Sequence, residues 1–220
     1  SAYKAGARTV KVIAESLELT LSLEGYDVRR LPLPDVGGSM ATLRSAAVRA
    51  NPRTVLLDLD LGRFGDGMNL IAPLARAGAN VVVVTASTDR GRWGACMRQG
   101  ARKVLSKGGQ LQETLATVRR LHQGLPVTTR EELEGLLDAW KEQHEARDHM
   151  RRRLELLTPR ERKVLDHLIA GQSVRDIAKI SVVAEATVRT QVKSILAKLE
   201  VSSQLAAVGL ANHIGWRHRD

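Results

Sequence analysis

The chain has 220 residues, of which 43% are hydrophobic and only 3% are aromatic. This length suits two small domains, and the shortage of aromatic residues means that their cores rest on aliphatic side chains. No apolar run approaches the roughly 20 residues that a membrane-spanning helix needs, and the opening residues lack the apolar stretch of a secretory signal. The single cysteine, Cys96, excludes an internal disulfide framework, and we therefore expect a cytoplasmic protein.

The formal net charge of +10 is concentrated toward the C-terminus. From Arg151 to Asp220 there are 13 lysines and arginines against 7 aspartates and glutamates, a net of +6. A small basic domain indicates a polyanionic partner, because neutralising phosphates releases their counterions. On charge alone, a basic surface that is merely solvated stays an alternative.

Short apolar or β-branched runs alternate with helical stretches over residues 1–125. The expected strands are Thr9–Ala14, Tyr26–Arg30, Thr54–Leu59, Asn80–Ala86 and Arg102–Ser106, and the expected helices are Glu15–Leu23, Gly38–Arg49, Met68–Ala77, Arg90–Gln99 and Gln110–Gln123. This alternation predicts an α/β fold, a doubly wound parallel sheet of five strands with helices on both faces. The runs Val55–Leu57 and Val81–Val84 are typical of fully buried central strands.

A helical linker is expected after the Gly124–Pro126 break, over Arg130–Arg153, which is rich in strong helix formers. Its apolar residues share one face: Leu133, Leu136, Leu137 and Trp140. That face could pair with a partner chain, but polar residues further along make a solvated connector equally compatible with the pattern. We therefore predict a domain over residues 1–126, a linker over 127–153 and a second domain over 154–220.

The last segment predicts an all-α domain of four short helices. The first begins with the capping box Thr158–Glu161 and a proline at its first position, and Ser173 caps the second, with Asp176 replacing the usual glutamate. The third spans about Ala184–Leu199 and has one apolar stripe of Val188, Val192, Ile195, Leu196 and Leu199. The fourth, Ser203–His213, offers Leu205, Ala206, Val208, Gly209 and Ala211 either to its own domain or to a second copy of the chain.

This segment resembles LuxR-type helix-turn-helix domains. The match runs through Leu157–Leu165, Ala170–Ser173, Asp176–Ala178, Thr187–Arg189, Val192–Leu196 and Lys198–Leu199, with Ala184 where the family usually has a capping serine. The resemblance implies a DNA-binding transcriptional regulator acting on double-stranded DNA as a homodimer. It places Arg189, Thr190 and Lys193 toward the major groove, where arginine reads guanine and threonine meets the thymine methyl. It makes Thr187, Ser173 and Lys198 phosphate contacts.

The N-terminal half resembles the receiver domain of response regulators, which makes the whole chain similar to the NarL/FixJ group. Asp58 ends the third strand where receivers carry the phosphoacceptor, Thr85 ends the fourth, and Lys107 follows the fifth. Such residues meet at the carboxyl edge of a parallel sheet, where a lysine and a hydroxyl stabilise the charge of a phosphoryl group. The resemblance implies phosphorylation of Asp58 by a sensor histidine kinase.

Several receiver features are altered. The acid pair that holds Mg²⁺ in the family is Ala14–Glu15 here, the loop after Asp58 has Leu61–Gly62 in place of Met-Pro, and the aromatic switch position is Val104. The chain requires no cofactor on this interpretation, and Glu15, Asp58 and Asp60 would form at most a weak Mg²⁺ site. We therefore predict an atypical receiver pocket of Glu15, Asp60, Thr85 and Lys107 around Asp58 that acts independently of phosphorylation; an ordinary phosphorylated response regulator is the alternative.

Two other classes of function fit less well. A LuxR-type regulator gated by a small molecule would use an aromatic-lined ligand domain, which the strand–helix alternation and the few aromatic residues disfavour. An enzyme is disfavoured because Gly62, Gly65 and Gly67 form neither a GxGxxG nor a P-loop pattern, and no nucleophile–histidine set falls at strand ends.

Overall fold

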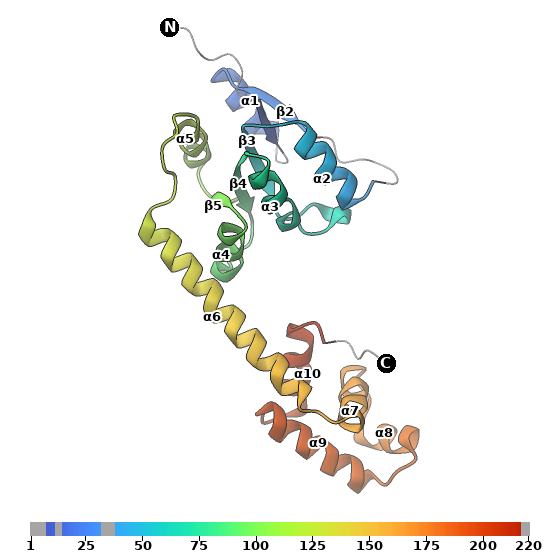
Figure 1. Cartoon of the computed structure of the whole chain (residues 1–220). Helices are drawn as coiled ribbons and strands as arrows, with labels where there is room; N and C mark the ends of the chain where they lie inside the picture. Colours follow the sequence, from blue (N-terminus) through green and yellow to red (C-terminus); the bar gives the residue numbers. More distant parts are fainter. Residues whose placement is uncertain (1–7, 12–14, 32–37, 217–220) are drawn as a thin grey trace. The chain divides into compact units, whose positions relative to one another are not determined.

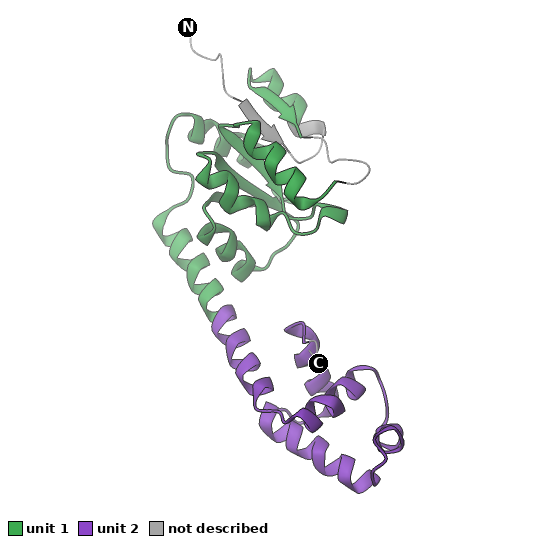
Figure 2. Cartoon of the chain, turned by 45° about the vertical axis from the view of Figure 1, so that its right-hand side comes forward, with its two compact units in different colours: residues 1–142 green, residues 143–220 purple. Residues whose placement is uncertain are grey.

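The computed structural model describes residues 8–11, 15–31 and 38–216, with side chains described from Glu18 onward (Figure 1). The chain divides into two compact units, residues 1–142 and 143–220 (Figure 2). The predicted linker, residues 127–153, falls largely within one helix, Arg130–Glu155, and this helix crosses the division between the units. The domain limits at residues 126 and 154 therefore stay predictions. Ala14, one of the altered receiver positions, lies outside the described residues, and so does the side chain of Glu15.

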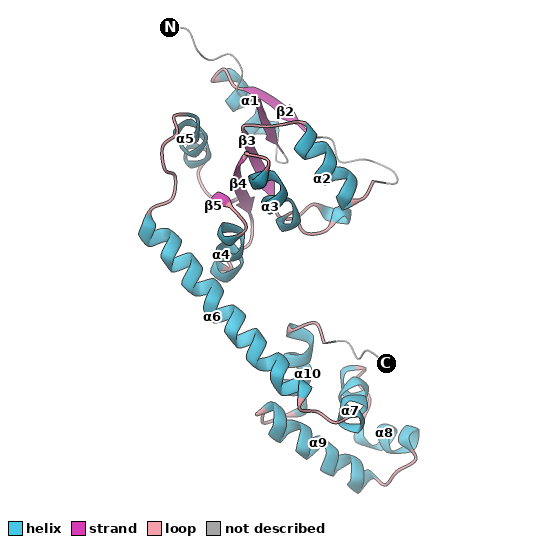
Figure 3. Ribbon diagram, viewed as in Figure 1, coloured by secondary structure: helices cyan, strands magenta, loops and turns pink. Residues whose placement is uncertain are grey.

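A five-stranded parallel sheet forms the centre of the first unit (Figure 3). Its strands are β1 (Arg8–Lys11), β2 (Asp27–Arg30), β3 (Thr54–Asp58), β4 (Asn80–Thr85) and β5 (Ala101–Ser106), in the order β2-β1-β3-β4-β5. All four pairings are parallel. The expected α/β class is therefore confirmed. In the sheet, β1 lies between β2 and β3, and this arrangement marks where the direction of winding reverses.

Helices cover both faces of this sheet, as the alternation of side chains along buried strands requires. They are α1 (Glu15–Leu23), α2 (Met40–Arg49), α3 (Met68–Arg76), α4 (Arg90–Arg98) and α5 (Leu111–His122), with a short 3₁₀ turn η1 (Gly62–Phe64). On one face, Leu57 and Val83 pack with Leu43 and Leu70 from α2 and α3. On the other face, Leu56 packs with side chains of α1 and α5.

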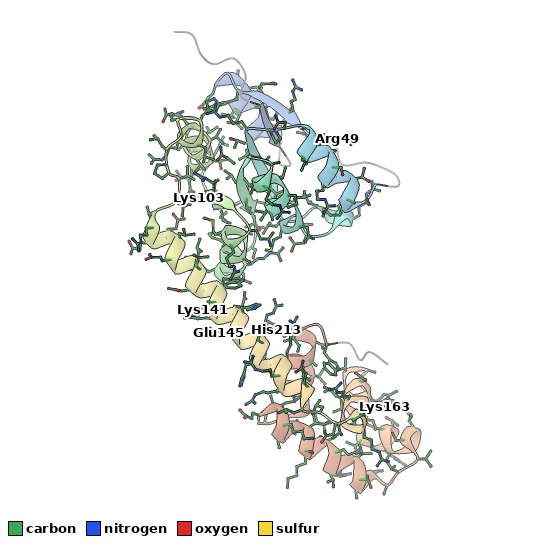
Figure 4. All side chains as sticks on the ribbon, viewed as in Figure 1. Arg49, Lys103, Lys141, Glu145, Lys163 and His213 are labelled. Carbon is green, nitrogen blue, oxygen red and sulfur yellow. The ribbon has the colours of Figure 1, made fainter. Side chains whose placement is uncertain are left out.

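The long helix α6 (Arg130–Glu155) begins in the first unit, where its apolar face is covered. Leu136 is buried, and the Arg98 guanidinium lies 3.8 Å from the centre of the Trp140 ring. Lys103 of β5, labelled in Figure 4, donates to the Glu132 carboxylate at 2.7 Å. A side chain at Gly94 would collide with the Leu136 carbonyl oxygen, so glycine allows the close approach of α4 and α6. The first part of α6 is thus packed against its own domain.

The second unit contains four further helices, α7 (Pro159–Ile169), α8 (Val174–Ser181), α9 (Glu185–Leu199) and α10 (Gln204–His213). Both predicted capping boxes are present, Thr158 with Glu161 and Ser173 with Asp176. Ala184 begins α9 without a side-chain cap, as its sequence predicted. Four residues of the predicted stripe of α9 are buried in one core with side chains of α7, α8 and α10, and Leu196 is partly buried against it.

Among the described residues, no single helix is long and apolar enough to cross a membrane; only α9 and α10 taken together, bent by 54° at the break between them, reach that length and composition.

Candidate nucleic-acid interface and receiver pocket

The α9 helix presents a polar, basic stripe opposite its buried side. Val188 and Val192 point into the core, whereas Arg189, Thr190 and Lys193 are exposed. The Arg189 guanidinium lies 3.2 Å from the Glu185 carboxylate one turn earlier, and the Thr190 hydroxyl donates to a backbone carbonyl of the same helix at 3.0 Å. These weak, exposed contacts leave the stripe accessible to a partner.

The three predicted phosphate contacts have different environments. Thr187 is exposed at the start of α9. The Ser173 hydroxyl caps α8 and donates to Asp176 at 2.5 Å. Lys198 donates to the buried Glu161 carboxylate at 2.7 Å. Of the three, only Thr187 has no such structural task, and the assignment of all three as phosphate contacts stays a prediction.

Glu161 joins α7 to α9 through a network that the sequence did not reveal. One carboxylate oxygen accepts from the Ser194 hydroxyl and the other from Lys198 and the Thr158 backbone N–H, each at 2.7 Å. Burial by itself raises the pKa of Glu161, but the hydrogen bonds from Lys198, Ser194 and Thr158 outweigh it and hold the pKa at about 2. Ser194 and Lys198 are four residues apart on one helix face, and this spacing was the available signal.

The carboxyl ends of β3 and β4 open into a cavity of about 460 Å³. Four of the five residues named for the receiver pocket and its acceptor line it: Asp58, Asp60, Thr85 and Lys107. The fifth is Glu15, whose backbone begins α1 and whose side chain lies outside the described residues. The sheet topology brings these residues together because parallel strands end at one edge.

The Asp58 carboxylate is fully engaged within this cavity. One of its oxygens accepts from the Asp60 backbone N–H at 3.0 Å, and the other is bound directly by the Lys107 ammonium. Thr85 is buried, and its hydroxyl accepts from the Ser87 backbone N–H at 3.1 Å. The pocket therefore holds an internal ion pair at the position where the family carries its phosphoacceptor.

Asp66 and Arg92 also line the cavity, and sequence reasoning missed both of them. The Arg92 guanidinium donates to Asp66 at 2.9 Å, which ties the loop after β3 to the start of α4. The other Asp66 oxygen accepts from the Met68 backbone N–H at 2.9 Å. No local signal predicts this pair, since the two residues are separated by 26 positions in the chain.

The described carboxylates around this cavity make hydrogen bonds within the protein. One Asp60 carboxylate oxygen accepts from the Gly62 backbone N–H at 3.0 Å. The Asp58 and Asp66 carboxylates accept from the backbone N–H groups of Asp60 and Met68. Within the described part of the chain, no three acidic, histidine or cysteine side chains are grouped so as to hold a metal. The Mg²⁺ site of Glu15, Asp58 and Asp60 stays a prediction, because the side chain of Glu15 lies outside the described residues.

Two further positions that the sequence singled out, Val104 and Cys96, lie in the core of the first unit. Val104, at the family's aromatic switch position, is a buried aliphatic residue of β5. Cys96 is buried in α4, and its burial raises the pKa of the thiol to about 12, so that it stays protonated at neutral pH. Its side chain packs in the core of the first unit.

Comparison with known proteins finds similarity over both units. The family described as bacterial regulatory proteins, luxR family, matches residues 155–211. The uncharacterized transcriptional regulatory protein YhcZ of Bacillus subtilis is 30% identical over 158 residues, which cover 71% of this chain and 72% of that protein. The nitrate/nitrite response regulator protein homolog of Haemophilus influenzae is 28% identical over 168 residues, 76% of each chain.

Solved structures also match along most of the chain. RcsB from Salmonella enterica serovar Typhimurium, bound to the promoter P1flhDC in the presence of a phosphomimetic, is 20% identical. The alignment covers 93% of this chain and 97% of that one, with a TM-score of 0.46.

Proposed function

Since this chain belongs to the NarL/FixJ-type response regulators, we propose that it binds double-stranded DNA through the exposed stripe of α9. Members of this family are transcriptional regulators and not enzymes, and they join a receiver domain to a LuxR-type helix-turn-helix domain. The observation that carries this proposal is the division of α9 into a buried apolar stripe and an exposed stripe of Arg189, Thr190 and Lys193. A recognition helix in the major groove needs both, one to anchor it and one to meet base edges.

The salt dependence of DNA binding by the full chain tests this proposal. Each lysine or arginine that neutralises a phosphate contributes about −0.9 to the slope of log affinity against log salt. We expect binding to duplex DNA to weaken steeply between about 50 and 200 mM salt. Affinity that does not change with salt, or no binding to any duplex in a random pool, would contradict the proposal.

We further propose that the receiver pocket works without phosphorylation of Asp58. The Lys107 ammonium already neutralises the Asp58 carboxylate within the pocket. The acid at position 14 is replaced by alanine, and Val104 has no polar group with which to report on Thr85. The pocket then holds one conformation, and DNA binding follows protein concentration.

Treatment with acetyl phosphate and Mg²⁺, followed by intact-mass measurement, tests the second proposal. We expect little or no phosphoryl adduct and no change in DNA affinity. A near-stoichiometric adduct that is absent from Asp58→Asn and raises DNA affinity about tenfold, about 1.4 kcal/mol, would instead establish the alternative, an ordinary regulator served by a sensor histidine kinase. The joint lining of one cavity by Asp58, Thr85 and Lys107 is the observation that favours this alternative.

A homodimer through α10 is the assembly that we propose on DNA. Leu205 is 82% exposed, and Ala206 and Gly209 are exposed beside it, which leaves a small-residue surface open to a second helix. Ala211, which the sequence grouped with them, is instead buried in its own domain. Leu205→Glu should weaken cooperative binding to two half-sites, measured by footprinting, while Leu156→Glu, at another exposed leucine, should not. Equal footprints for both variants would exclude α10 as the dimer contact.

A further inference from the structure

We propose that the apolar segment of residues 180–183, which comprises the end of α8 and the start of the turn to α9, contacts thymine methyl groups in the major groove and so helps to set the DNA sequence that the protein selects. The inference rests on the proposed DNA-binding function and adds a specificity determinant that lies outside the exposed stripe of α9. It is carried by the backbone of Val182, by the exposure of its neighbours and by the charges of the adjoining groove.

Val182 adopts a backbone conformation that disfavours valine. It ends α8 with φ 53° and ψ 49°, in the left-handed region. Helices commonly end there with glycine or asparagine, because a branched side chain at Cβ crowds the following carbonyl oxygen. Among the described residues, only two other non-glycine residues, Asn51 and Glu200, have a positive φ.

The other two positions have reasons that Val182 lacks. Asparagine tolerates the left-handed region, which accounts for Asn51. Glu200 ends α9, and its carboxylate is paired with Arg153 of the same domain. Val182 is 90% exposed, so packing within its own domain does not compensate its strained backbone. The fold uses the left-handed backbone to end α8, where the Val183 backbone N–H donates to the Ala178 carbonyl, but it makes no use of an exposed valine side chain there. A disfavoured residue type that the fold does not need points to a role of the side chain in contact with a partner.

Val182 is one of three large aliphatic residues exposed within four positions. Ile180 is 53% exposed and Val183 is 41% exposed. Ile180 lies in α8 and Val183 precedes α9, whereas Ile177 of α8 and Val188 of α9 are fully buried. The segment therefore presents an apolar surface that the core of the domain does not cover.

The groove beside this segment has the charge of a nucleic-acid contact. It is an open groove of about 510 Å³, and its lining includes Arg175 and Lys179 of α8, Val182 and Val183. One acidic residue, Glu185, also lines it, and the Glu185 carboxylate is paired with Arg189. The two cations of α8 are exposed and suit phosphate oxygens. Cations beside aliphatic groups match the rim of a major groove, where phosphates flank the thymine methyl.

The position of the segment identifies DNA as the occupant of this surface. In helix-turn-helix domains the first residues of the second helix meet base edges, while the first helix crosses the phosphate backbone. Residues 182–184 connect these two helices and Ile180 lies in the last turn of α8, so a duplex that seats α9 brings its base edges close to this segment. An apolar protein partner would be less well matched to a groove flanked by Arg175 and Lys179.

The test uses the full chain and the best-binding duplex selected from a random pool. Each thymine of that duplex is replaced in turn by deoxyuridine, which removes only the 5-methyl group. At one or two positions we expect the wild type to lose affinity about fourfold, the factor for one buried methylene. Val182→Asn, which keeps the left-handed backbone without the branched side chain, should bind the thymine and uracil duplexes equally at those positions.

A stability measurement separates this result from damage to the fold. Because asparagine suits the left-handed backbone, we expect Val182→Asn to raise the Tm by several degrees while it loses sensitivity to the methyl group. Leu156→Asn, a matched loss of an exposed aliphatic side chain in the same domain, should keep the full methyl dependence. Identical methyl dependence in wild type and Val182→Asn would overturn the inference alone, whereas failure to select any duplex would overturn the proposed function and this inference with it.

Discussion

Replacement of Glu161 by glutamine tests whether one buried carboxylate holds the helix-turn-helix domain together. The substitution keeps the size of the side chain and removes the charge that accepts hydrogen bonds from Ser194, Lys198 and the Thr158 backbone. Glu161 is 6% exposed, so this charge is stabilised almost entirely by the protein. Glutamine can accept at one oxygen only, and the Lys198 ammonium loses the negative charge with which it is paired.

The expected loss of stability follows from these contacts. A hydrogen bond to a charged group contributes about 1.5–3 kcal/mol, and removing one partner of a buried ion pair costs about 3–5 kcal/mol. Since the Lys198 side chain is 31% exposed, water partly replaces the lost carboxylate, and the lower figures apply. We expect a loss of about 2–3 kcal/mol, which for a domain of this size lowers the Tm by roughly 10–20 °C.

The pH dependence gives the same prediction an independent check. The folded-state pKa of about 2 lies below the ordinary value of 4.5, so the stabilisation is complete above pH 4.5 and is lost as the pH falls toward 2. The difference in unfolding free energy between wild type and Glu161→Gln should therefore be constant near neutral pH and shrink below pH 4.5. Thermal denaturation at several pH values measures it, with the exposed Glu155→Gln as control. A Tm equal to that of the wild type, or a difference that does not change with pH, would refute the reasoning.

Two further predictions concern the first unit. Gly94→Val should destabilise the protein by about 1–3 kcal/mol, because the valine side chain would collide with the Leu136 carbonyl oxygen. Gly135→Ala should not destabilise it, because the added carbon lies 3.5 Å from its nearest neighbour. Equal melting temperatures of the two variants would show that α6 does not dock closely. Arg92→Leu should speed amide hydrogen exchange in the loop after β3, since Asp66 loses the guanidinium that ties this loop to α4; unchanged protection at Met68 would show that the tie is not needed.

The sequence predicted the order and nature of the helices and strands because local periodicity determines them. Val81–Val84 can only be a buried strand in an α/β chain, and the capping boxes at Thr158 and Ser173 mark helix starts to the residue. The expected strand Thr9–Ala14 begins one residue earlier in the structure, at Arg8, and its last three residues lie outside those described.

The contacts that the sequence left unseen join elements far apart in the chain. Glu161 meets Ser194 and Lys198 across 33 and 37 residues, and Arg92 meets Asp66 across 26. Each of these side chains also fits a solvated helix face or loop, so its type and local spacing carry no unique signal. Lys198 is an example, since the resemblance implies a phosphate contact for it, while its contact with Glu161 is visible only in the structure.

Val182 illustrates a different limit. The sequence gives no reason to expect a valine at a left-handed helix end, where glycine or asparagine is favoured. Only the backbone angles and the exposure of the side chain together reveal the position as unusual. Information of this kind is absent from hydrophobic periodicity, which treats an exposed valine as a core residue.

The affinity of the full chain for a selected duplex, compared between wild type and Arg189→Ala/Lys193→Ala, tests the central claim most directly. Both residues lie on the exposed stripe of α9, and Arg44→Ala/Arg49→Ala on α2 removes the same charge from the other unit as a control. If Arg189 reads a base, its loss alone costs about 1–3 kcal/mol at the preferred site, and the loss of Lys193 reduces the salt dependence. The account predicts that the α9 variant loses selection and affinity while the α2 variant keeps both. Equal affinity of wild type and the α9 variant across the whole selected pool would contradict it.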